Sequence, residues 1–294
     1  MAIRVTQSML TNNMLSNMSK SYEQMGKYQK QLSTGKKISR PSDDPVVAMK
    51  GMNYRTQLTE IEQFQRNIGE VHNWMDNSDA ALDKTTKALQ RLRELAVQAS
   101  NGTYEKGQRE NIAEEVKQLK DHIKDLANTK VNNKYIFNGK NTTEAPVSVN
   151  ETDGSLVKNF NSESVNIEVS KATKLNVNVD GNEVFGKDLF SDIDQFVSNL
   201  NPGKDLGDSI TAMDDNINNV VNTRADLGAR MNRVELVEDR LSSQEIMATR
   251  ILSDNEDAEL EKVITKLKTQ ESIHRAALSV GARIIQPTLM DFLR

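Results

Sequence analysis

The sequence predicts a mainly α-helical fold: an elongated helical bundle or coiled coil built from both chain ends, with a small β-containing outer domain inserted between them. Two observations carry this prediction. On both sides of the middle, apolar residues recur in alternating steps of three and four, which is typical of helices that pack along one narrow stripe. The middle itself, about residues 141–205, alternates apolar and polar residues with a period of two, which is typical of short antiparallel strands.

Three inner segments carry the most regular stripes. They run from Ile61 to Ala99, from Ile112 to Leu126 and from Ile210 to Leu241. Because their stripes match, we expect them to pack together in the monomer, with the helices that carry Leu92 and Leu227 facing one another, so that alanine substitutions of these two leucines are non-additive. The seam positions that we single out are Leu89, Leu92, Leu119, Ile217, Leu227 and Met231.

Local signals place the element boundaries. Gly35 is positioned to end the first helix, and Asp44 followed by Pro45 predicts the N-cap and first residue of the second. Asn138-Gly139 predicts a hairpin turn, and the stretch from Ser253 to Glu256 reads as a capping box that starts the last helix. We therefore expect helices at about 6–34, 45–99, 108–128, 189–200, 206–252 and from 253 onward.

The two terminal helices carry stripes that have no long partner in the chain except each other. A lone helix in water is marginal. We therefore expect residues 1–43 and 253–294 to be disordered in the isolated monomer and to fold when neighbouring molecules supply the missing surface. The predicted assembly contacts are Met14, Met18, Met25, Leu32, Leu267, Leu278, Ile285 and Leu289.

This pattern gives three predicted domains. Residues 1–44 with 253–294 form the terminal helices, residues 45–140 with 206–252 form a helical rod, and residues 141–205 form the outer domain. Arg224 and Glu238 fall on seam positions of the rod, where a polar residue specifies pairing at some cost in stability.

Composition excludes several classes of protein. Of the 294 residues, 36% are apolar and 4% aromatic, which suits an elongated bundle better than a thick core. The net charge of −4 gives no nucleic-acid-binding surface, and no apolar run approaches the roughly 20 residues of a membrane span. The absence of cysteine excludes disulfides and zinc–thiolate sites. Residues 1–20 lack the apolar core of a signal peptide, so we expect either a cytosolic protein or one exported without a cleaved signal.

The search for catalytic motifs is negative. The sequence contains no P-loop, no G-x-G-x-x-G, no G-x-S-x-G and no H-E-x-x-H. Glu271 and His274 have the spacing used by helical di-iron sites, but such a site needs a second copy of the motif. We therefore predict no catalytic, cofactor-binding or metal site, and expect His274 to be exposed or to line a seam. A metal-dependent helical enzyme is the corresponding alternative.

Three segments resemble one family. The segment from Leu32 to Pro45 is similar to the N-terminal signature of bacterial flagellins and their hook-associated relatives. The segment from Thr223 to Val234 resembles a C-terminal helix of the same family, and Ala276 to Leu293 resembles its terminal helix. Within the family, 42–45, 99–103 and 134–139 are most similar to the members at the hook–filament junction.

The resemblance implies a structural subunit and not an enzyme. Such proteins leave the cell unfolded through the flagellar type III export channel, and they assemble as a ring with the terminal helices forming the inner tube. The implied partners are copies of the chain itself, hook-associated protein 1, flagellin and a flagellar export chaperone, and the implied location is the extracellular flagellum. The alternatives are the filament flagellin itself and a cytosolic coiled-coil adaptor or chaperone.

Overall fold

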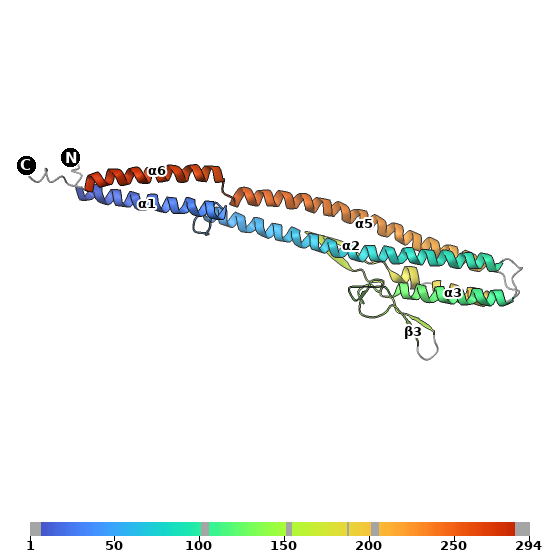
Figure 1. Cartoon of the computed structure of the whole chain (residues 1–294). Coiled ribbons are helices and arrows are strands. Elements are labelled where there is room, and N and C mark those ends of the chain that lie inside the picture. The colour runs from blue at the N-terminus through green and yellow to red at the C-terminus, as the bar shows by residue number, and fades with distance from the viewer. Residues whose placement is uncertain (1–6, 101–105, 151–154, 187, 201–205, 286–294) are drawn as a thin grey trace, which may run out of the picture. The chain divides into compact units, whose positions relative to one another are not determined.

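The computed structural model describes residues 7–100, 106–150, 155–186, 188–200 and 206–285 and falls into two compact units (Figure 1). Unit 1 draws on residues 1–60 and 245–294, and unit 2 on residues 61–244. The described helices are α1 (Gln7–Thr34), α2 (Pro45–Ser100), α3 (Lys106–Ala127), the π-helix η1 (Asn182–Gly186), α4 (Leu189–Asn199), α5 (Gly207–Glu256) and α6 (Leu260–Ile285). The strands are β1 (Lys130–Val131), β2 (Lys134–Tyr135), β3 (Val147–Val149), β4 (Leu156–Lys158), β5 (Asn166–Ser170) and β6 (Thr173–Asn176).

These elements confirm a mainly α fold with a small β-containing insert. The strands form three separate antiparallel pairs, β1–β2, β3–β4 and β5–β6. The predicted period-two segment is the β5–β6 hairpin, in which Ile167 lies opposite Leu175. Residues 101–105 and 201–205, which fall between helices that the sequence predicts, lie outside the described residues. The three-domain division suggested by the sequence stays a prediction.

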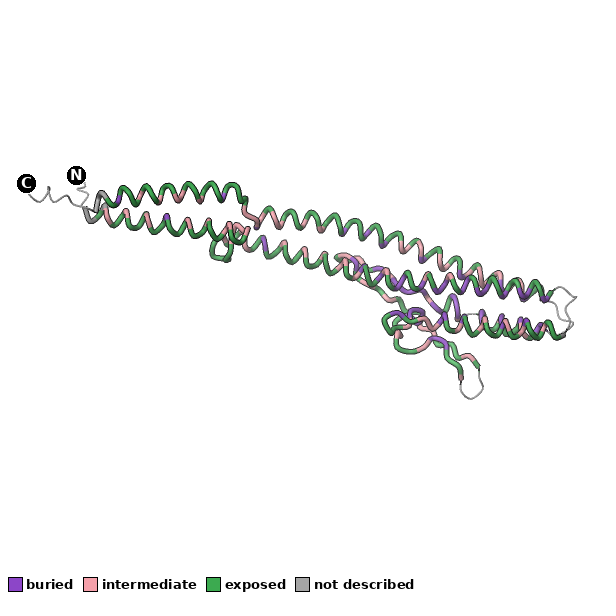
Figure 2. The backbone as a smooth tube through the Cα atoms, viewed as in Figure 1, coloured by how far each residue is buried: buried purple, intermediate pink, exposed green. Residues whose placement is uncertain are grey.

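The hydrophobic core lies in unit 2 and follows the predicted stripe of α2. Val71, Met75 and Leu82 are completely buried, as are the seam positions Leu89 and Leu92. Figure 2 shows this as a line of buried positions along the part of α2 that belongs to unit 2. The core extends into the insert, whose buried residues include Val169, Val177, Phe185, Phe190 and Phe196.

Two polar residues interrupt the α2 stripe without leaving unsatisfied groups. Ser78 and Thr85 are both fully buried. Their hydroxyls donate to backbone carbonyls four residues earlier, Ser78 to Trp74 at 2.8 Å and Thr85 to Ala81 at 2.9 Å. Because each hydroxyl is satisfied within its own helix, the seam can be buried at these positions.

Ion pairs show the register of α2 against α5 and correct one expectation. His72 pairs with Glu238 at 3.1 Å, and Arg93 pairs with Asp214 at 2.5 Å, so the helices run antiparallel. Leu92 therefore lies beside the start of α5. Leu227 lies opposite a point of α2 that is about 12 residues from Leu92, which corresponds to about 18 Å at 1.5 Å per residue. The two helices face one another as expected, but Leu92 and Leu227 lie at different levels of the pair, because heptad stripes fix which face packs but not the register.

The first hairpin turn also differs from its prediction. It lies at Asn132–Asn133, between β1 and β2, where both residues have positive φ angles of 50° and 64°. The predicted turn at Asn138-Gly139 is present, since the Asn141 N–H donates to the Asn138 carbonyl at 2.9 Å and Gly139 has a φ angle of +49°, but it lies in a buried loop and joins no pair of the described strands. The Asn138 side chain accepts from the Asn161 N–H at 2.8 Å and donates to the Glu144 carbonyl at 3.0 Å. Asn138 thus ties loop segments together, a role that its turn propensity does not reveal.

In unit 1 the boundaries of α1 and α2 follow the sequence signals. Gly35 has a φ angle of +68°, the left-handed conformation typical of a residue that follows a helix. The Asp44 carboxylate accepts from the N–H groups of Val46 at 3.0 Å and Val47 at 3.1 Å, which is the geometry of an N-cap. These two signals place the loop between α1 and α2 at residues 35–44.

The predicted start of the last helix was wrong. The residues read as a capping box, 253–256, are the last turn of α5, and α6 begins at Leu260. Helical bonding continues through this turn, since the Asp257 N–H donates to the Ser253 carbonyl at 2.8 Å. The Glu256 carboxylate, which would close a capping box, is used in ion pairs with Arg55 and Lys36. Tertiary contacts therefore override the local capping pattern.

Candidate functional site: the terminal helices and their charged cluster

The helices α1 and α6 pack against each other within unit 1 (Figure 1). Ser21 of α1 and Val263 of α6 are both 7% exposed, and the Gln270 amide donates to the Ser21 hydroxyl at 2.9 Å. The predicted assembly residues Met14, Met18, Met25, Leu32 and Leu267 are half-buried. Leu278 is 45% exposed, Ile285 ends α6, and Leu289 lies outside the described residues.

This seam is thin and partly polar. The Tyr22 and His274 rings lie 6.1 Å apart between their centroids, so His274 lines the seam. Its Nδ1 is buried and has no hydrogen-bond partner among the described residues. At the far end of the pair, Gly281 is buried against Met14, where a Cβ would overlap the Met14 side chain. The pairing of α1 with α6 thus depends on separate individual contacts and not on a continuous apolar core.

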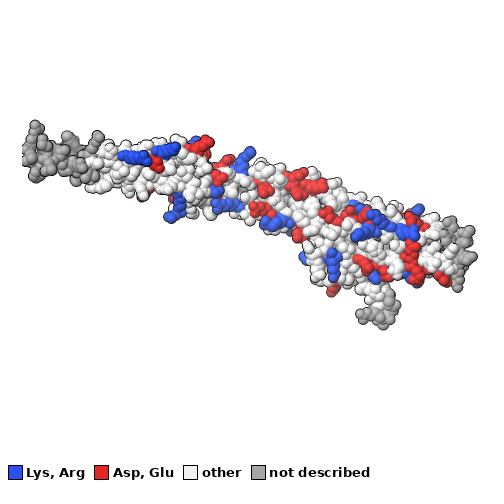
Figure 3. All heavy atoms as spheres, viewed as in Figure 1, with Lys and Arg blue, Asp and Glu red and all other residues white. Residues whose placement is uncertain are grey.

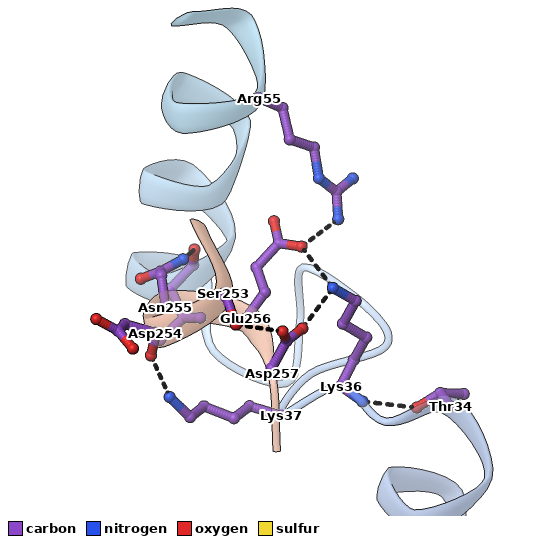
Figure 4. A network of polar contacts seen from close by, with 10 residues as sticks. Thr34, Lys36, Lys37, Arg55, Ser253, Asp254, Asn255, Glu256 and Asp257 are labelled. Atoms are coloured by element: carbon purple, nitrogen blue, oxygen red, sulfur yellow. Dashed lines mark hydrogen bonds and ion pairs between the residues drawn. The ribbon is translucent and has the colours of Figure 1, made fainter. Parts of the chain in front are cut away.

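Five charged residues gather where the terminal helices meet the rest of unit 1. We call Lys36, Lys37, Arg55, Glu256 and Asp257 the charged cluster (Figure 4). The Glu256 side chain is only 7% exposed, and its carboxylate lies 2.6 Å from Arg55 and 3.6 Å from the Lys36 ammonium. Lys36 also pairs with Asp257 at 2.6 Å. The hydrogen bond from Lys36, with a second one from Ser253, lowers the pKa of Asp257 below its usual value.

Backbone groups join the same segments. The Lys37 N–H donates to the Glu256 carbonyl at 2.7 Å, and the Ala258 N–H donates to the Gly35 carbonyl at 2.8 Å. The Asn255 amide donates to the Val47 carbonyl at 3.0 Å. Three segments are therefore held together: the loop after α1, the first turns of α2 and the end of α5.

Gly51 makes room for the cluster. It is buried on α2, and a Cβ at this position would overlap the Glu256 carboxylate. The absence of a side chain allows a buried carboxylate to lie directly against the backbone of α2. Arg55 lies one helical turn further along the same helix and supplies the opposite charge.

The loop between α1 and α2 has its own internal anchor. The Asp43 carboxylate accepts from the N–H groups of Ser39 at 3.0 Å and Arg40 at 2.9 Å. These two backbone hydrogen bonds lower the pKa of Asp43. The loop thus has a defined conformation that presents Lys36 and Lys37 to the end of α5.

The predicted seam residues lie in unit 2. Leu89, Leu92 and Leu227 are at most 1% exposed, and Leu119, Ile217 and Met231 are half-buried. Arg224, expected as a polar seam contact, forms two hydrogen bonds to Asp79 at 2.9 and 3.2 Å and one to Asp83 at 2.9 Å. The bond to Asp79 is the main cause that raises the Arg224 pKa. Glu238 contacts His72, as the register requires.

Among the described residues, no set of three or more histidine, aspartate or glutamate side chains could hold a metal ion. None of the described helices combines the length and apolar character needed to cross a membrane.

Sequence reasoning missed the charged cluster. Glu256 was assigned to a helix cap, and Gly51 and Arg55 carried no signal of their own inside a long helix. The only available hint was the concentration of opposite charges in two distant segments, Lys36-Lys37 and Asp254–Asp257. Local patterns do not show that these segments meet.

Comparison with known proteins identifies the family to which this chain belongs. Residues 5–142 match the model of the bacterial flagellin N-terminal helical region, and residues 210–293 match that of the C-terminal helical region. The chain therefore belongs to the bacterial flagellin family, whose members are structural proteins and not enzymes.

Particular relatives cover nearly the whole chain. Flagellar hook-associated protein 3 of Escherichia coli (strain K12) is 27% identical over 92% of this chain and 93% of its own length. Flagellin of Bacillus subtilis (strain 168) is also 27% identical, over 97% of each chain. A solved structure of a hook-associated protein from Vibrio parahaemolyticus has a TM-score of 0.68 at 23% identity and covers 73% of this chain and 100% of that one. The last comparison establishes the shared fold.

Proposed function

We propose that this protein is the structural subunit that joins the flagellar hook to the filament. The similarity to hook-associated protein 3 over almost the full length of both chains supports the proposal. It is further supported by segments 42–45, 99–103 and 134–139, which resemble the junction members of the family. In this function the subunit forms a ring with copies of itself, contacts hook-associated protein 1 on one side and the first flagellin on the other, and is exported unfolded with the help of a chaperone.

The chemistry of the terminal helices suits assembly. α1 has no charged residue from Gln7 to Ser19, and α6 has none from Ala276 to Ala282. On the face shown in Figure 3, few charged side chains cover this part of unit 1. Burial of an unpaired charge is costly, whereas uncharged surface can be covered without that cost. These helix segments can therefore be enclosed by neighbouring subunits.

Exposed apolar side chains mark the same unit. Most of the large apolar residues that are exposed in the described chain belong to unit 1, among them Leu15, Met49, Leu260, Leu278 and Val280. Apolar surface left open on a folded subunit is typical of an interaction site. We propose that subunit contacts in the ring cover these residues and that the β-containing insert faces outward.

A proline in α6 tests the assembly role. Leu278→Pro removes a helical hydrogen bond, at a cost of about 3 kcal/mol or more in a helix interior. We expect the variant to be exported and its unit 2 to stay folded, but not to be incorporated into flagella. Leu278→Ala, which keeps the helix, is the matched control and should be incorporated at least partly. Filament growth on cells that contain only the proline variant would refute the assembly role of α6.

The filament flagellin is the second candidate. The Bacillus subtilis flagellin is 27% identical over 97% of both chains, which is the same identity as that of the Escherichia coli hook-associated protein 3. Overall similarity therefore supports both functions equally. Antibody labelling of sheared flagella separates the two functions: a junction subunit is labelled at one point beside the hook, and a flagellin is labelled along the filament.

A further inference from the structure

The two units of the chain differ in net charge. Unit 1 contains 16 lysine and arginine residues and 12 aspartate and glutamate residues, whereas unit 2 contains 22 and 30. The net charges are therefore +4 and −8, although the net charge of the whole chain is only −4. Surfaces of opposite charge attract one another, and surfaces of like charge repel. When identical copies assemble, unit 1 of one copy is thus electrostatically matched to unit 2 of another.

A basic groove lies on unit 1, between the end of α1 and the loop that follows it. Its volume is about 270 Å³, and its charged lining residues are Lys27, Lys30, Lys37, Arg40 and Asp43. The Asp43 carboxylate accepts from two backbone N–H groups of the loop. The side chains of Lys27, Lys30 and Arg40 are exposed, and none of them forms an ion pair with another described residue. The groove therefore carries an excess of positive charge.

An apolar hollow adjoins the basic groove and shares Ser39 and Arg40 with it. Its volume is about 160 Å³, and its apolar lining residues are Ile38, Pro41, Ala48 and Met52. Met52 is 58% exposed, so this apolar surface is uncovered. A surface that fits both the groove and the hollow must combine carboxylates with an exposed apolar side chain.

The helix α5 carries that combination on unit 2. Leu236 is 71% exposed, which is the highest value among the exposed large apolar residues of the described chain. Glu235 and Asp239 lie along one side of it, with Arg233 and Arg240 on the other. Both carboxylates are exposed, and neither forms an ion pair with another described residue. Because Glu235 and Asp239 are four residues apart, their charges repel, and contact with cations relieves that repulsion.

We propose that unit 1 of one copy binds unit 2 of a neighbouring copy, with Glu235 and Asp239 in the basic groove and Leu236 over the apolar hollow. Lys27 and Lys30 are three residues apart on α1, so they span about one helical turn, as the two carboxylates do. Each contact therefore pairs two cations with two anions. This inference rests on the assembly of identical copies in the proposed function and adds which surfaces meet.

The contact is directional, because each copy uses a different surface toward each of two neighbours. Contacts of this kind close into a ring when the rotation between copies allows it, and otherwise they continue as a helix. The proposed contact is therefore compatible with a ring of subunits. Like charges would face one another if unit 1 of one copy met unit 1 of the next, which disfavours that arrangement.

Site-directed crosslinking of assembled flagella tests the contact. The chain contains no cysteine, so Lys30→Cys and Asp239→Cys introduce its only thiols. With both substitutions in one chain, a short bismaleimide should link copies into dimers and longer ladders on a denaturing gel. The matched control combines Lys30→Cys with Asp208→Cys. Asp208 is another exposed carboxylate of α5, about 46 Å along the helix from Asp239, and this pair should give no ladder.

A charge exchange tests the attraction itself. Lys27→Glu with Lys30→Glu should lower incorporation into flagella at least about tenfold, since like charges then meet at every contact. Export into the medium should not change. Glu235→Lys with Asp239→Lys should have the same effect, with the Trp74 fluorescence of unit 2 unchanged. All four substitutions in one chain restore opposite charges between copies and should recover at least about half of the wild-type incorporation.

The outcomes separate this proposal from the junction function. Crosslinks within single chains only, equal ladders in the Asp208→Cys control, or wild-type incorporation of either double variant would overturn the proposed contact. A four-substitution variant that is not recovered would overturn it too, because the groove would then meet a different protein. The junction function is judged by antibody labelling of the wild type. Labelling along the filament refutes that function, whereas the crosslinks decide the contact between copies in either case.

Discussion

The register of α2 and α5 leads to a double-mutant prediction. The pairs His72–Glu238 and Arg93–Asp214 lie on either side of Leu227, so the turn of α2 opposite Leu227 is the one that contains Leu82. Both leucines are at most 1% exposed. We expect Leu82→Ala and Leu227→Ala to be coupled, and Leu92→Ala and Leu227→Ala to be independent.

The magnitudes follow from burial and separation. Each leucine-to-alanine change at a fully buried position should lower the free energy of unfolding by about 2–5 kcal/mol. For Leu82 with Leu227, the two cavities share neighbours, so the double mutant should deviate from additivity by about 0.5–3 kcal/mol. For Leu92 with Leu227, the separation of about 18 Å along the helix should give additivity within about 0.5 kcal/mol.

A single intrinsic probe reports on this unit. Trp74 is the only tryptophan of the chain, lies on α2 in unit 2 and is 6% exposed. Urea unfolding of the monomer followed by Trp74 fluorescence therefore measures the free energy of unfolding of unit 2. Strict additivity for Leu82 with Leu227, or strong coupling for Leu92 with Leu227, would show that the register is not the one described. Single costs below about 0.5 kcal/mol would show that these leucines face solvent.

Two further predictions concern unit 1. Asp44→Ala removes the N-cap of α2 and should cost about 0.5–2 kcal/mol, measured as the loss of protection in residues 46–52, while Asp44→Asn should retain most of it. The pKa values of Asp43 and Asp257 are both lowered in the folded chain, so the stability that they contribute is present above the usual aspartate pKa and is lost as pH falls through the lowered values. Circular dichroism during acidification below about pH 4 should therefore show a loss of order that is smaller in Asp257→Asn than in the wild type.

The helical stripes were predictable because one physical rule governs them. Along α2, the positions of the three-four stripe are buried from Ile68 onward, including the polar Ser78 and Thr85, although Trp74, Ala81 and Leu95 beside the stripe are buried as well. Backbone signals that need a special conformation were equally informative, as Gly35 and the Asp44 cap show. Each of these features depends on residues within a few positions of one another.

Features that depend on distant segments were not predictable. The stripe does not specify how far α5 slides along α2, so Leu92 was expected to couple with a residue that lies at a different level of the pair. Residues 253–256 have the sequence of a capping box, but they form the last turn of α5. The Glu256 carboxylate pairs with Lys36 and Arg55 instead of capping a new helix. In the same way, the burial of Val263 and Gly281 depends on what α1 presents to α6.

Polar residues occur in both seams, but they are satisfied differently. Ser78 and Thr85 bond to carbonyls of their own helix, so α2 keeps these bonds whatever packs against it. The Gln270–Ser21 bond instead joins α6 to α1, and the buried Nδ1 of His274 has no partner among the described residues. A buried polar group without a partner costs free energy, so separation or rearrangement of α1 and α6 relieves part of that cost. The polar groups of the seam in unit 2 are therefore satisfied within α2, whereas those of the seam in unit 1 depend on the partner helix or stay unsatisfied.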